Sequence, residues 1–290
     1  MSLVVIVGET VSGKSNLAFK LARKINGEII CADSTTVRKN LNIGTAKPTT
    51  EEREKIKHHL IDLIEPTEHF TVVDFQKLAI QTIDDVSLKN KVPILVGGSG
   101  LYINSVIYNY NFDNNYNEVF HKKLIGSSLE TLQKLAIQRK LDITKIDFLN
   151  SRRLITFIEN NGNFSNKSSL LPNTIVIGIK INREELIKRV IKRIDKMLSD
   201  GLEKEVKYLK FCLGDDFNKI NIIGYKEWQE YLVSKENIKT VRSKIISHTL
   251  QLAKKQRTWF HQNKDIIWLD NNVSLDKVVD LITTTLNNKI

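Results

Sequence analysis

The chain has 290 residues, of which 41% are hydrophobic and 27% are charged, and its formal net charge is +11. These proportions are typical of a globular protein with one large domain or two small ones, and they exclude a disordered chain. The longest apolar runs, at 4–8 and 92–98, fall far short of the ~20 residues that cross a bilayer, so we expect no membrane segment.

The first apolar run begins at Leu3 and leaves no room for a charged leader region, so we expect the protein in the cytoplasm. Cys31 and Cys212 lie far apart and lack a zinc-binding spacing. Neither a disulfide framework nor a cysteine metal site is therefore expected. The positive charge fits an anionic partner such as nucleic acid, but a solvated basic surface accounts for it equally well.

Short β-branched runs alternate with helical patterns from residue 3 to 110, which predicts a parallel sheet covered by helices. The predicted strands cover 4–8, 28–34 and 92–98, and the predicted helices cover 15–25, 75–87 and 101–108. From 109 to 117 the composition shifts to Asn, Tyr and Asp, which indicates a hinge or loop. Two helical patterns follow, at 129–140 and 150–159.

The pattern then returns to the sheet. A polar stretch at 160–169 leads to a predicted strand at 173–181, and two long helical patterns cover 183–212 and 238–262. We therefore predict an α/β fold, with a parallel sheet, helices on both faces and a small helical insertion. The predicted core comprises 1–110 and 171–290, and the predicted insertion comprises 111–170.

One motif stands between the first predicted strand and its helix. The run Gly8, Glu9, Thr10, Val11, Ser12, Gly13, Lys14 and Ser15 matches the P-loop pattern G-x-x-x-x-G-K-[ST] in full. Backbone N–H groups of such a loop converge on phosphate oxygens, and the helix N-terminus adds positive potential. Lys14 would neutralise the phosphates, and the Ser15 hydroxyl can ligate Mg²⁺. By itself this loop indicates a nucleotide-binding, ATP-hydrolysing or phosphoryl-transferring enzyme.

A carboxylate and a hydroxyl follow two other predicted strands. Asp33 ends the strand at 28–34, where it would face the ligand crevice of an open α/β sheet. It is the prime candidate for a general base, and a helix N-cap or a Mg²⁺ ligand are the alternatives. Ser99 lies in the Gly97–Gly100 turn after the strand at 92–98 and could donate to a phosphate or bridging oxygen, or could cap the next helix.

The basic residues of the C-terminal half allow two interpretations. Arg183, Arg189 and Arg193 share one helical pattern and could clamp a diphosphate or form a solvated face. In LAKKQRTWF (252–260), basic groups beside aromatic ones suit RNA contact, although core packing is the more frequent role of such aromatics. The pair His58–His59 lacks a metal-ligand spacing and is interpreted as structural.

Taken together, these motifs make the chain resemble the bacterial tRNA dimethylallyltransferases (tRNA isopentenyltransferases). The matching blocks run in family order from residue 4 to about 260: GETVSGKS, IICADS, NIGTAKPT, HHLIDLIEP, VVDF, VPILVGGSGLY, RRLI, RIDKMLSDGLEKEV, IGYKE and LAKKQRTWF. The resemblance implies a P-loop-type core with a small helical insertion that contacts tRNA. It implies transfer of a dimethylallyl group from dimethylallyl diphosphate to N6 of adenosine 37 in the anticodon stem-loop of tRNA, with release of diphosphate.

The resemblance also implies roles for single residues. The loop from Gly8 to Ser15 would hold a diphosphate with Arg193, Ser15 would ligate Mg²⁺, and Asp33 and Ser99 would be catalytic. The residues implied to contact tRNA are Asp33, Ser34, Thr35, Thr36, Ser99, Phe120, Arg152, Arg153, Leu154, Ile155 and Thr156. An exocyclic amine is a poor nucleophile, so catalysis must combine orientation, a base and charge neutralisation at the leaving diphosphate. We expect a monomer.

The chain departs from the family pattern at several of these positions. Glu9 replaces the usual proline, which places a carboxylate close to the phosphates, and Ser99 replaces a threonine. Thr156 and Phe120 stand where arginines are usual. Two other functions stay open: prenyl transfer to free adenine nucleotides, which would need no long basic C-terminal helix, and a P-loop nucleotide kinase.

Overall fold

The computed structural model describes residues 2–112, 118–162, 168–233 and 237–287, which form two compact units. The larger unit comprises Met1–Ile107 and Leu170–Ile290, and the smaller unit comprises Tyr108–Ser169. The predicted insertion was 111–170, and part of the predicted Asn-rich loop, 113–117, lies outside the described residues. No helix in the described ranges is both long enough and apolar enough to cross a membrane.

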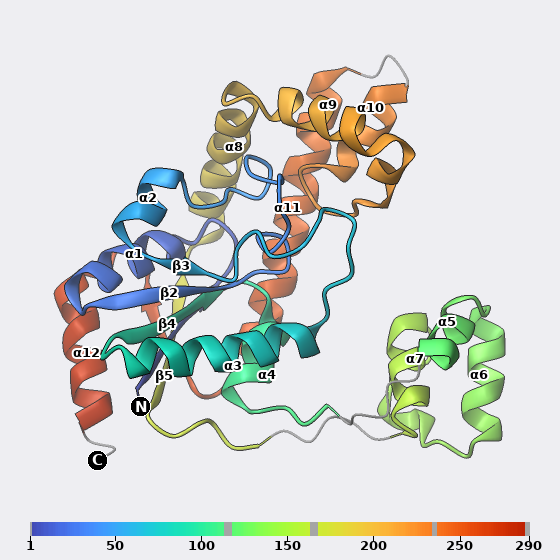
Figure 1. Cartoon of the computed structure of the whole chain (residues 1–290), viewed down its shortest axis with the longest axis horizontal. Helices are drawn as coiled ribbons and strands as arrows, with labels where there is room; N and C mark the ends of the chain where they lie inside the picture. Colours follow the sequence, from blue (N-terminus) through green and yellow to red (C-terminus); the bar gives the residue numbers. More distant parts are fainter. Residues whose placement is uncertain (1, 113–117, 163–167, 234–236, 288–290) are drawn as a thin grey trace. The chain divides into compact units, whose positions relative to one another are not determined.

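A six-stranded parallel sheet forms the centre of the larger unit (Figure 1). Its strand order is β3-β2-β4-β1-β5-β6, and every pairing is parallel. The strands are β1 (Leu3–Gly8), β2 (Gly27–Ala32), β3 (His58–His59), β4 (Val92–Gly97), β5 (Thr174–Lys180) and β6 (Ile266–Asp270). The predicted α/β fold is confirmed, although the sequence patterns predicted neither β3 nor β6.

The strand register determines where the site lies. Every residue of β1 is buried, as expected for a parallel strand covered on both faces. Gly97 of β4 pairs with both Val7 of β1 and Ala32 of β2. The three central strands therefore end side by side, so the residues that follow them, from Gly8, Asp33 and Gly98 onward, gather at one edge of the sheet.

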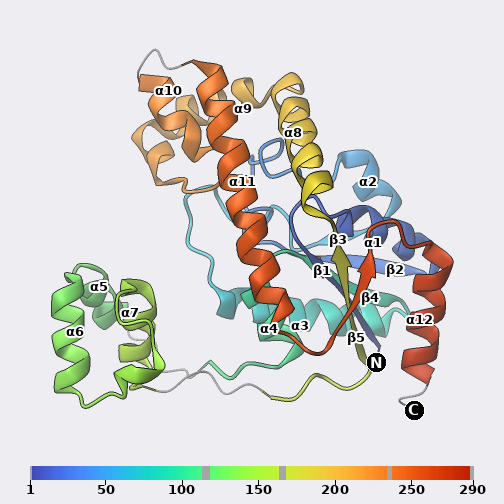
Figure 2. The same cartoon turned by 180° about the vertical axis from the view of Figure 1, so that it is seen from behind.

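Helices cover both faces of the sheet (Figures 1 and 2). On one face, α1 (Lys14–Lys24) and α12 (Leu275–Asn287) share an apolar core with the strands. The helices on the other face are α3 (Val72–Leu88), α4 (Gly100–Ile107) and the lower part of α11 (Ile238–His261), while the short α2 (Thr50–Lys55) precedes β3. Capping boxes at Thr49 and Thr71 begin α2 and α3.

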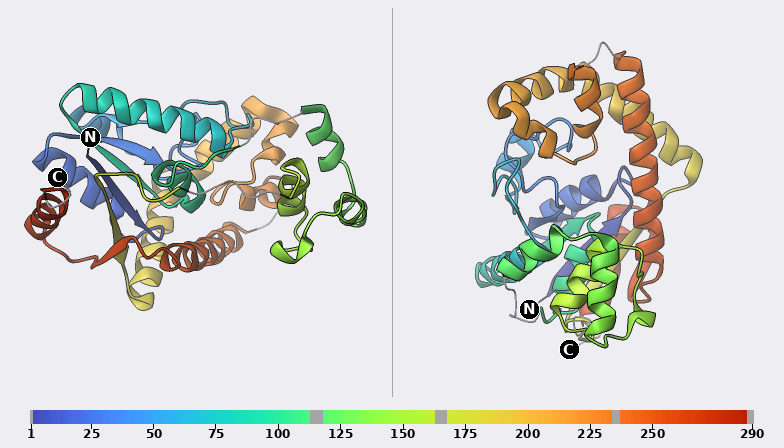
Figure 3. Two further views of the ribbon diagram at one scale, coloured as in Figure 1. Left: turned by 90° about the horizontal axis from the view of Figure 1, so that it is seen from below. Right: turned by 90° about the vertical axis from the view of Figure 1, so that its right-hand side faces the viewer.

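A helical lobe with its own apolar core extends the larger unit beyond the sheet. It is built from α8 (Arg183–Ser199), α9 (Leu202–Leu213), α10 (Gln229–Val233), two 3₁₀ segments (Gly214–Lys219 and Lys226–Trp228) and the upper part of α11. The prediction of one helix over 183–212 is wrong, because Gly201 has φ 103° and separates α8 from α9. The long helix α11 runs from this lobe down to α4 beside the sheet (Figure 3).

The smaller unit contains α5 (Glu118–Ile125), α6 (Leu129–Gln138), a 3₁₀ turn (Ile143–Lys145) and α7 (Ser151–Glu159). Its core is a separate cluster that includes Leu124, Leu132, Leu154 and Ile158. Ser128 and Asn150 cap α6 and α7 with their side chains. Both of these helices thus have a local start signal and one buried face.

Candidate active site

The loop Gly8–Ser15 connects β1 to α1 and presents the first turn of that helix. Gly13 is the N-cap of α1 with φ 100° and has no side chain to occupy the helix amides, while Val11 also has a positive φ of 64°. The Ser12 amide donates to the Glu9 carbonyl at 3.2 Å, which closes a turn inside the loop. This geometry leaves amide donors and the helix dipole available to an anion.

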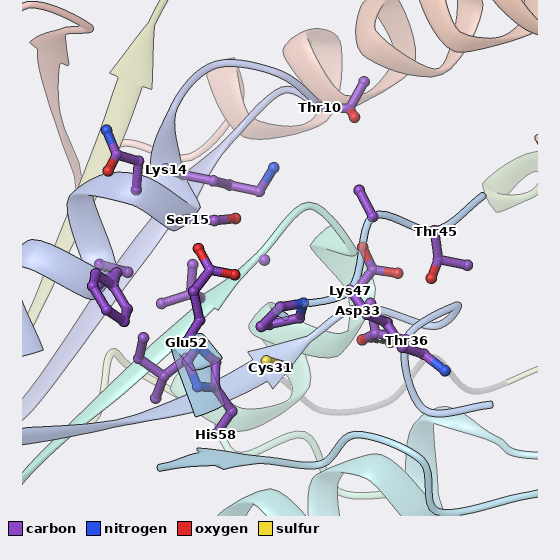
Figure 4. A pocket seen from close by; sticks show the side chains of 18 of the residues that line it. Thr10, Lys14, Ser15, Cys31, Asp33, Thr36, Thr45, Lys47, Glu52 and His58 are labelled. Atoms are coloured by element: carbon purple, nitrogen blue, oxygen red, sulfur yellow. Dashed lines mark hydrogen bonds between the residues drawn. The ribbon is translucent and has the colours of Figure 1, made fainter. Parts of the chain in front are cut away.

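Lys14 projects from this loop into a cavity (Figure 4). Its Nζ donates to the Glu9 carbonyl oxygen at 3.1 Å. The pKa of Lys14 is lowered to about 8, mainly by burial; the Asp33 carboxylate opposes this shift, Arg193 adds to it, and the Glu9 carboxylate opposes it. A cation kept half-buried with few partners is well suited to bind an anionic ligand.

Asp33 follows β2 at the carboxyl edge of the sheet. Its Oδ1 accepts from the Thr35 amide at 2.8 Å and from the Thr35 hydroxyl at 2.7 Å. Within the described residues, no hydrogen bond engages Oδ2. Residues 34–37 form turns rather than a helix, so the helix N-cap alternative for Asp33 is wrong. One carboxylate oxygen thus fixes the orientation, and the other is left to accept a proton or a ligand.

Ser99 lies beside Asp33 in the turn between β4 and α4. Its Oγ accepts from the Ser34 amide at 3.2 Å, which leaves the hydroxyl proton available. The backbone at Gly97 passes very close to that of Ala32. A Cβ on Gly97 would lie 1.9 Å from the Ala32 carbonyl oxygen, so only glycine fits there. The turn therefore holds Ser99 directly against the segment that begins with Asp33.

Of the three arginines predicted on one helix, Arg193 lies at the site. From α8 it reaches the Thr10 hydroxyl and the Thr45 carbonyl oxygen, both at 3.4 Å. Burial lowers the pKa of Arg193, and the charge of Asp33 raises it. Arg189 instead pairs with Glu185, although it also approaches the P-loop, and Arg183 is exposed.

Two cavities meet at these residues. The first, of about 350 Å³, lies between the P-loop, α1, the end of β2 and the segment 45–52. The second, of about 460 Å³, lies between the turns after β2 and β4, α8 and α11. Both cavities are lined by Thr10, Asp33, Thr45 and Arg193. The two cavities thus adjoin at these four side chains.

The segment 42–47 closes one side of both cavities and is held by distant residues. The Glu205 carboxylate accepts from the amides of Asn42, Ile43 and Gly44 at 3.0–3.3 Å. The hydroxyl of Tyr225 donates to Glu205 at 2.5 Å and accepts from the Gly44 amide at 3.1 Å. Burial raises the pKa of Tyr225. Residues of the blocks NIGTAKPT, GLEKEV and IGYKE, far apart in the sequence, thus meet at this anchor.

Residues near the end of α11 hold the site from the other side, which the sequence did not reveal. The Gln256 side chain accepts from the Thr10 amide at 2.7 Å and donates to the Gly98 carbonyl oxygen at 3.0 Å. A Cβ on Gly100 would lie 2.2 Å from Trp259. Phe260 is buried, as a core-packing role predicts, whereas Trp259 is 39% exposed and packs only in part.

His58 and His59 have different surroundings. His59 bonds the buried Glu28 carboxylate at 2.7 Å, as its structural interpretation predicts. His58 bonds the Ile56 carbonyl through Nδ1 at 2.7 Å and lines the first cavity, where burial lowers its pKa. Sequence spacing gave no signal for this second placement.

The remaining predicted RNA contacts fall in both units. In the larger unit, Ser34 and Thr35 line the second cavity, whereas Thr36 is buried in the wall of the first. In the smaller unit, Arg152, Arg153 and Thr156 are exposed on α7. Leu154 and Ile155 are buried in the core of that unit, so their side chains cannot face an RNA. Phe120 lies under the guanidinium of Arg139, 4.7 Å from the ring centre.

Comparisons with known proteins place the chain among close relatives. The family model described as IPP transferase matches residues 36–263. A tRNA dimethylallyltransferase of Staphylococcus aureus (strain JH9) is 36% identical over 98% of this chain and 97% of that protein.

Solved structures give the same picture. A full-length tRNA isopentenylpyrophosphate transferase from Bacillus halodurans has a TM-score of 0.77 and 32% identity, covering 99% of this chain and 97% of that one. A eukaryotic dimethylallyltransferase acting on tRNA has a TM-score of 0.86 and 25% identity, covering 99% of this chain and 80% of that one.

Proposed function

The chain belongs to the IPP transferase family, and from this membership we propose that it is a tRNA dimethylallyltransferase. It transfers a dimethylallyl group from dimethylallyl diphosphate to N6 of adenosine 37 in tRNA and releases diphosphate. The observation that carries this proposal is the position of Asp33, which lines both cavities and keeps one carboxylate oxygen without a hydrogen-bond donor among the described residues.

The first cavity suits the donor. Its volume of about 350 Å³ fits the lower end of small-ligand sites, which span roughly 300–1,000 Å³. At the P-loop end, Lys14, the amides of α1 and Arg193 offer positive charge to a diphosphate. Apolar side chains such as Phe19, Ile29 and Val96 line another part of the wall and suit the hydrocarbon group.

The residues of this site fit a magnesium ion if the diphosphate of the substrate supplies most of its ligands. Across the described residues, no cluster of three or more His, Cys, Asp or Glu side chains could hold a metal ion. Mg²⁺ commonly keeps several waters and binds phosphate oxygens, so the exposed Ser15 hydroxyl at the start of α1 would suffice as a protein ligand. Bound there, the ion would neutralise part of the diphosphate charge.

In the reaction, the bond between C1 of the dimethylallyl group and the diphosphate oxygen breaks, and its electron pair leaves with the diphosphate. The adenine N6 lone pair forms the new bond to C1, and N6 loses a proton to Asp33. Lys14 and Arg193 stabilise the charge that grows on the leaving group, to which Ser99 can donate a hydrogen bond. Because the amine is a weak nucleophile, holding it and C1 in contact is itself a large part of catalysis.

The second cavity suits the acceptor base. Ser34, Thr35 and Ser99 line it beside Asp33, and Tyr102 and Phe70 offer aromatic surface. We assign the exposed residues of α7, Arg152 and Arg153, to the RNA backbone. The monomeric state and the cytoplasmic location stay predictions.

The test is incubation with labelled dimethylallyl diphosphate and one of three acceptors: an unmodified anticodon stem-loop, the same stem-loop with guanosine at position 37, or AMP. We expect label only in the first RNA. Label in AMP would indicate an adenine-nucleotide prenyltransferase. Hydrolysis or transfer of the γ-phosphate of ATP, with no prenylation, would indicate a kinase and overturn the proposal.

A further inference from the structure

The P-loop of this chain contains a buried carboxylate. Glu9 is its second residue, and its side chain is 8% exposed. Its backbone oxygen already accepts from Lys14. A carboxylate at this place opposes the binding of a diphosphate, because like charges at short range in a poorly solvated site repel strongly.

Arg257 of α11 forms a two-point contact with this carboxylate. Its Nε donates to Glu9 Oε1 at 2.6 Å, and its Nη2 donates to Oε2 at 3.1 Å. Both carboxylate oxygens are thus engaged by one planar guanidinium, the strongest form of such a pair. The side chain of Arg257 is 37% exposed, so its charge reaches the loop from the solvent side.

Two further observations connect this pair to phosphate binding. The charge of Glu9 contributes to the pKa of Lys14, so Glu9 lies within electrostatic range of the cation that faces the cavity. The neighbouring Gln256 holds the Thr10 amide and the Gly98 carbonyl. Two adjacent residues of α11 therefore hold the start of the loop: Arg257 binds the Glu9 carboxylate, and Gln256 binds the Thr10 backbone.

We propose that Arg257 is a positioning residue of the donor site, which neutralises the Glu9 carboxylate and fixes it on α11 so that the loop accepts a diphosphate. The inference rests on the proposed function only for the identity of the anion. Arg257 touches neither reacting atom in this scheme. Its loss should therefore raise the Kd and KM for the donor and change kcat much less.

The probe is inorganic diphosphate, titrated into the full chain by calorimetry, with donor KM and kcat measured in parallel. We expect R257L to weaken diphosphate binding about ten- to a hundredfold, since it leaves a buried carboxylate unpaired beside the anion. E9Q should bind diphosphate at least as tightly as the unaltered chain. The double variant E9Q/R257L should return to within about threefold of it, because no unpaired charge remains.

A matched control exists on the same helix. Arg242 of α11 forms an equivalent fork with Asp195 of α8, at 2.5 and 3.0 Å, and its side chain is 35% exposed, but it does not contact the P-loop. R242L should leave diphosphate affinity unchanged and cost less folding stability than R257L, because the Asp195 carboxylate that it leaves unpaired is 49% exposed. R257K, which keeps the charge without the fork, should lose only a few-fold and still tests the idea if R257L does not fold.

Three results would overturn the proposal: unchanged diphosphate affinity in R257L, no recovery in E9Q/R257L, or an equal loss in R242L. The proposed function fails separately. A chain that shows the expected order of diphosphate affinities but prenylates no RNA would keep the role of Arg257 and refute the transferase activity.

Discussion

The P-loop and α7 both carry basic residues that we propose bind an anion, but the surroundings of these residues differ. Lys14 is half-buried, bonded to Glu9, and flanked by Arg193 and Asp33. Arg152 and Arg153 lie in solvent on a helix whose opposite face packs in a small core. A partly buried charge held in one position, such as that of Lys14, interacts strongly with one ligand atom. The charge of an exposed residue, such as Arg152 or Arg153, is screened by water and salt and attracts an anion only weakly. Mutations in the two regions should therefore affect different measurements.

The largest effect is expected at Asp33, whose Oδ2 takes the proton in the proposed reaction. Asp33→Asn should lower kcat by about a hundred- to ten-thousandfold, the usual contribution of a general base, and leave diphosphate binding unchanged. Single-turnover prenylation of a stem-loop at saturating donor measures the loss. Asp270→Asn, at the end of β6 and outside both cavities, is the control. Weakened diphosphate binding that excess Mg²⁺ rescues would instead make Asp33 a metal ligand.

The second-largest effect is expected at Lys14, which we propose binds the diphosphate directly. Lys14→Ala should weaken diphosphate binding by about ten- to a hundredfold, since charge-assisted hydrogen bonds contribute roughly 1.5–3 kcal/mol. Calorimetry with inorganic diphosphate measures it. Lys24→Ala, on the exposed last turn of the same helix, should change nothing. Equal losses in both variants would mean that the loop binds no phosphate.

A pH series sharpens the same contrast. The pKa of Lys14 in the free site is lowered to about 8, and a bound anion favours the protonated amine. Below pH 8 the amine is charged before and after binding, so Lys14 adds no pH dependence to the affinity. Above it the amine must take up a proton to bind, so affinity for diphosphate should fall by up to about tenfold per pH unit. Lys14→Arg stays charged throughout, so its profile isolates the titration of the anion itself.

The smallest effect is expected on α7. Arg152→Ala and Arg153→Ala should each weaken stem-loop binding a few-fold, and each should reduce the slope of log K against log salt by about 1 if the side chain contacts a phosphate. Kd values between low and high salt measure this slope. Lys134→Ala, an exposed residue of the same unit paired with Glu130, is the control. A change in kcat without a change in the salt slope would contradict the contrast between the regions.

Local sequence patterns were enough to predict that the groups we propose as catalytic lie at one edge of the sheet. The P-loop is contiguous, and Asp33 and Ser99 follow strands whose apolar runs are plain in the sequence. Parallel strands bring their carboxyl ends together, so the strand pattern alone assigns these groups to one crevice. The break at Gly201 was missed because a glycine inside a helical pattern is often tolerated.

The supporting residues could not be found in this way. Gln256 and Arg257 lie in a segment whose basic and aromatic composition suggests RNA contact, yet both side chains hold the P-loop. Glu205 looks like one of many exposed helical acids, yet it binds three successive amides of a distant loop. Such pairings depend on where α9 and α11 cross the sheet edge, which periodicity does not determine.

The attachment of the P-loop to α11 has a consequence for synthesis of the chain. The loop leaves the ribosome before its partner Arg257, which follows 248 positions later. Contacts of such high sequence separation form late, because the intervening chain must be ordered first. A nascent chain that ends before α11 carries the complete phosphate-binding motif with the Glu9 carboxylate still unpaired. The full diphosphate affinity should therefore arise only after α11 has been synthesised and has folded onto the sheet.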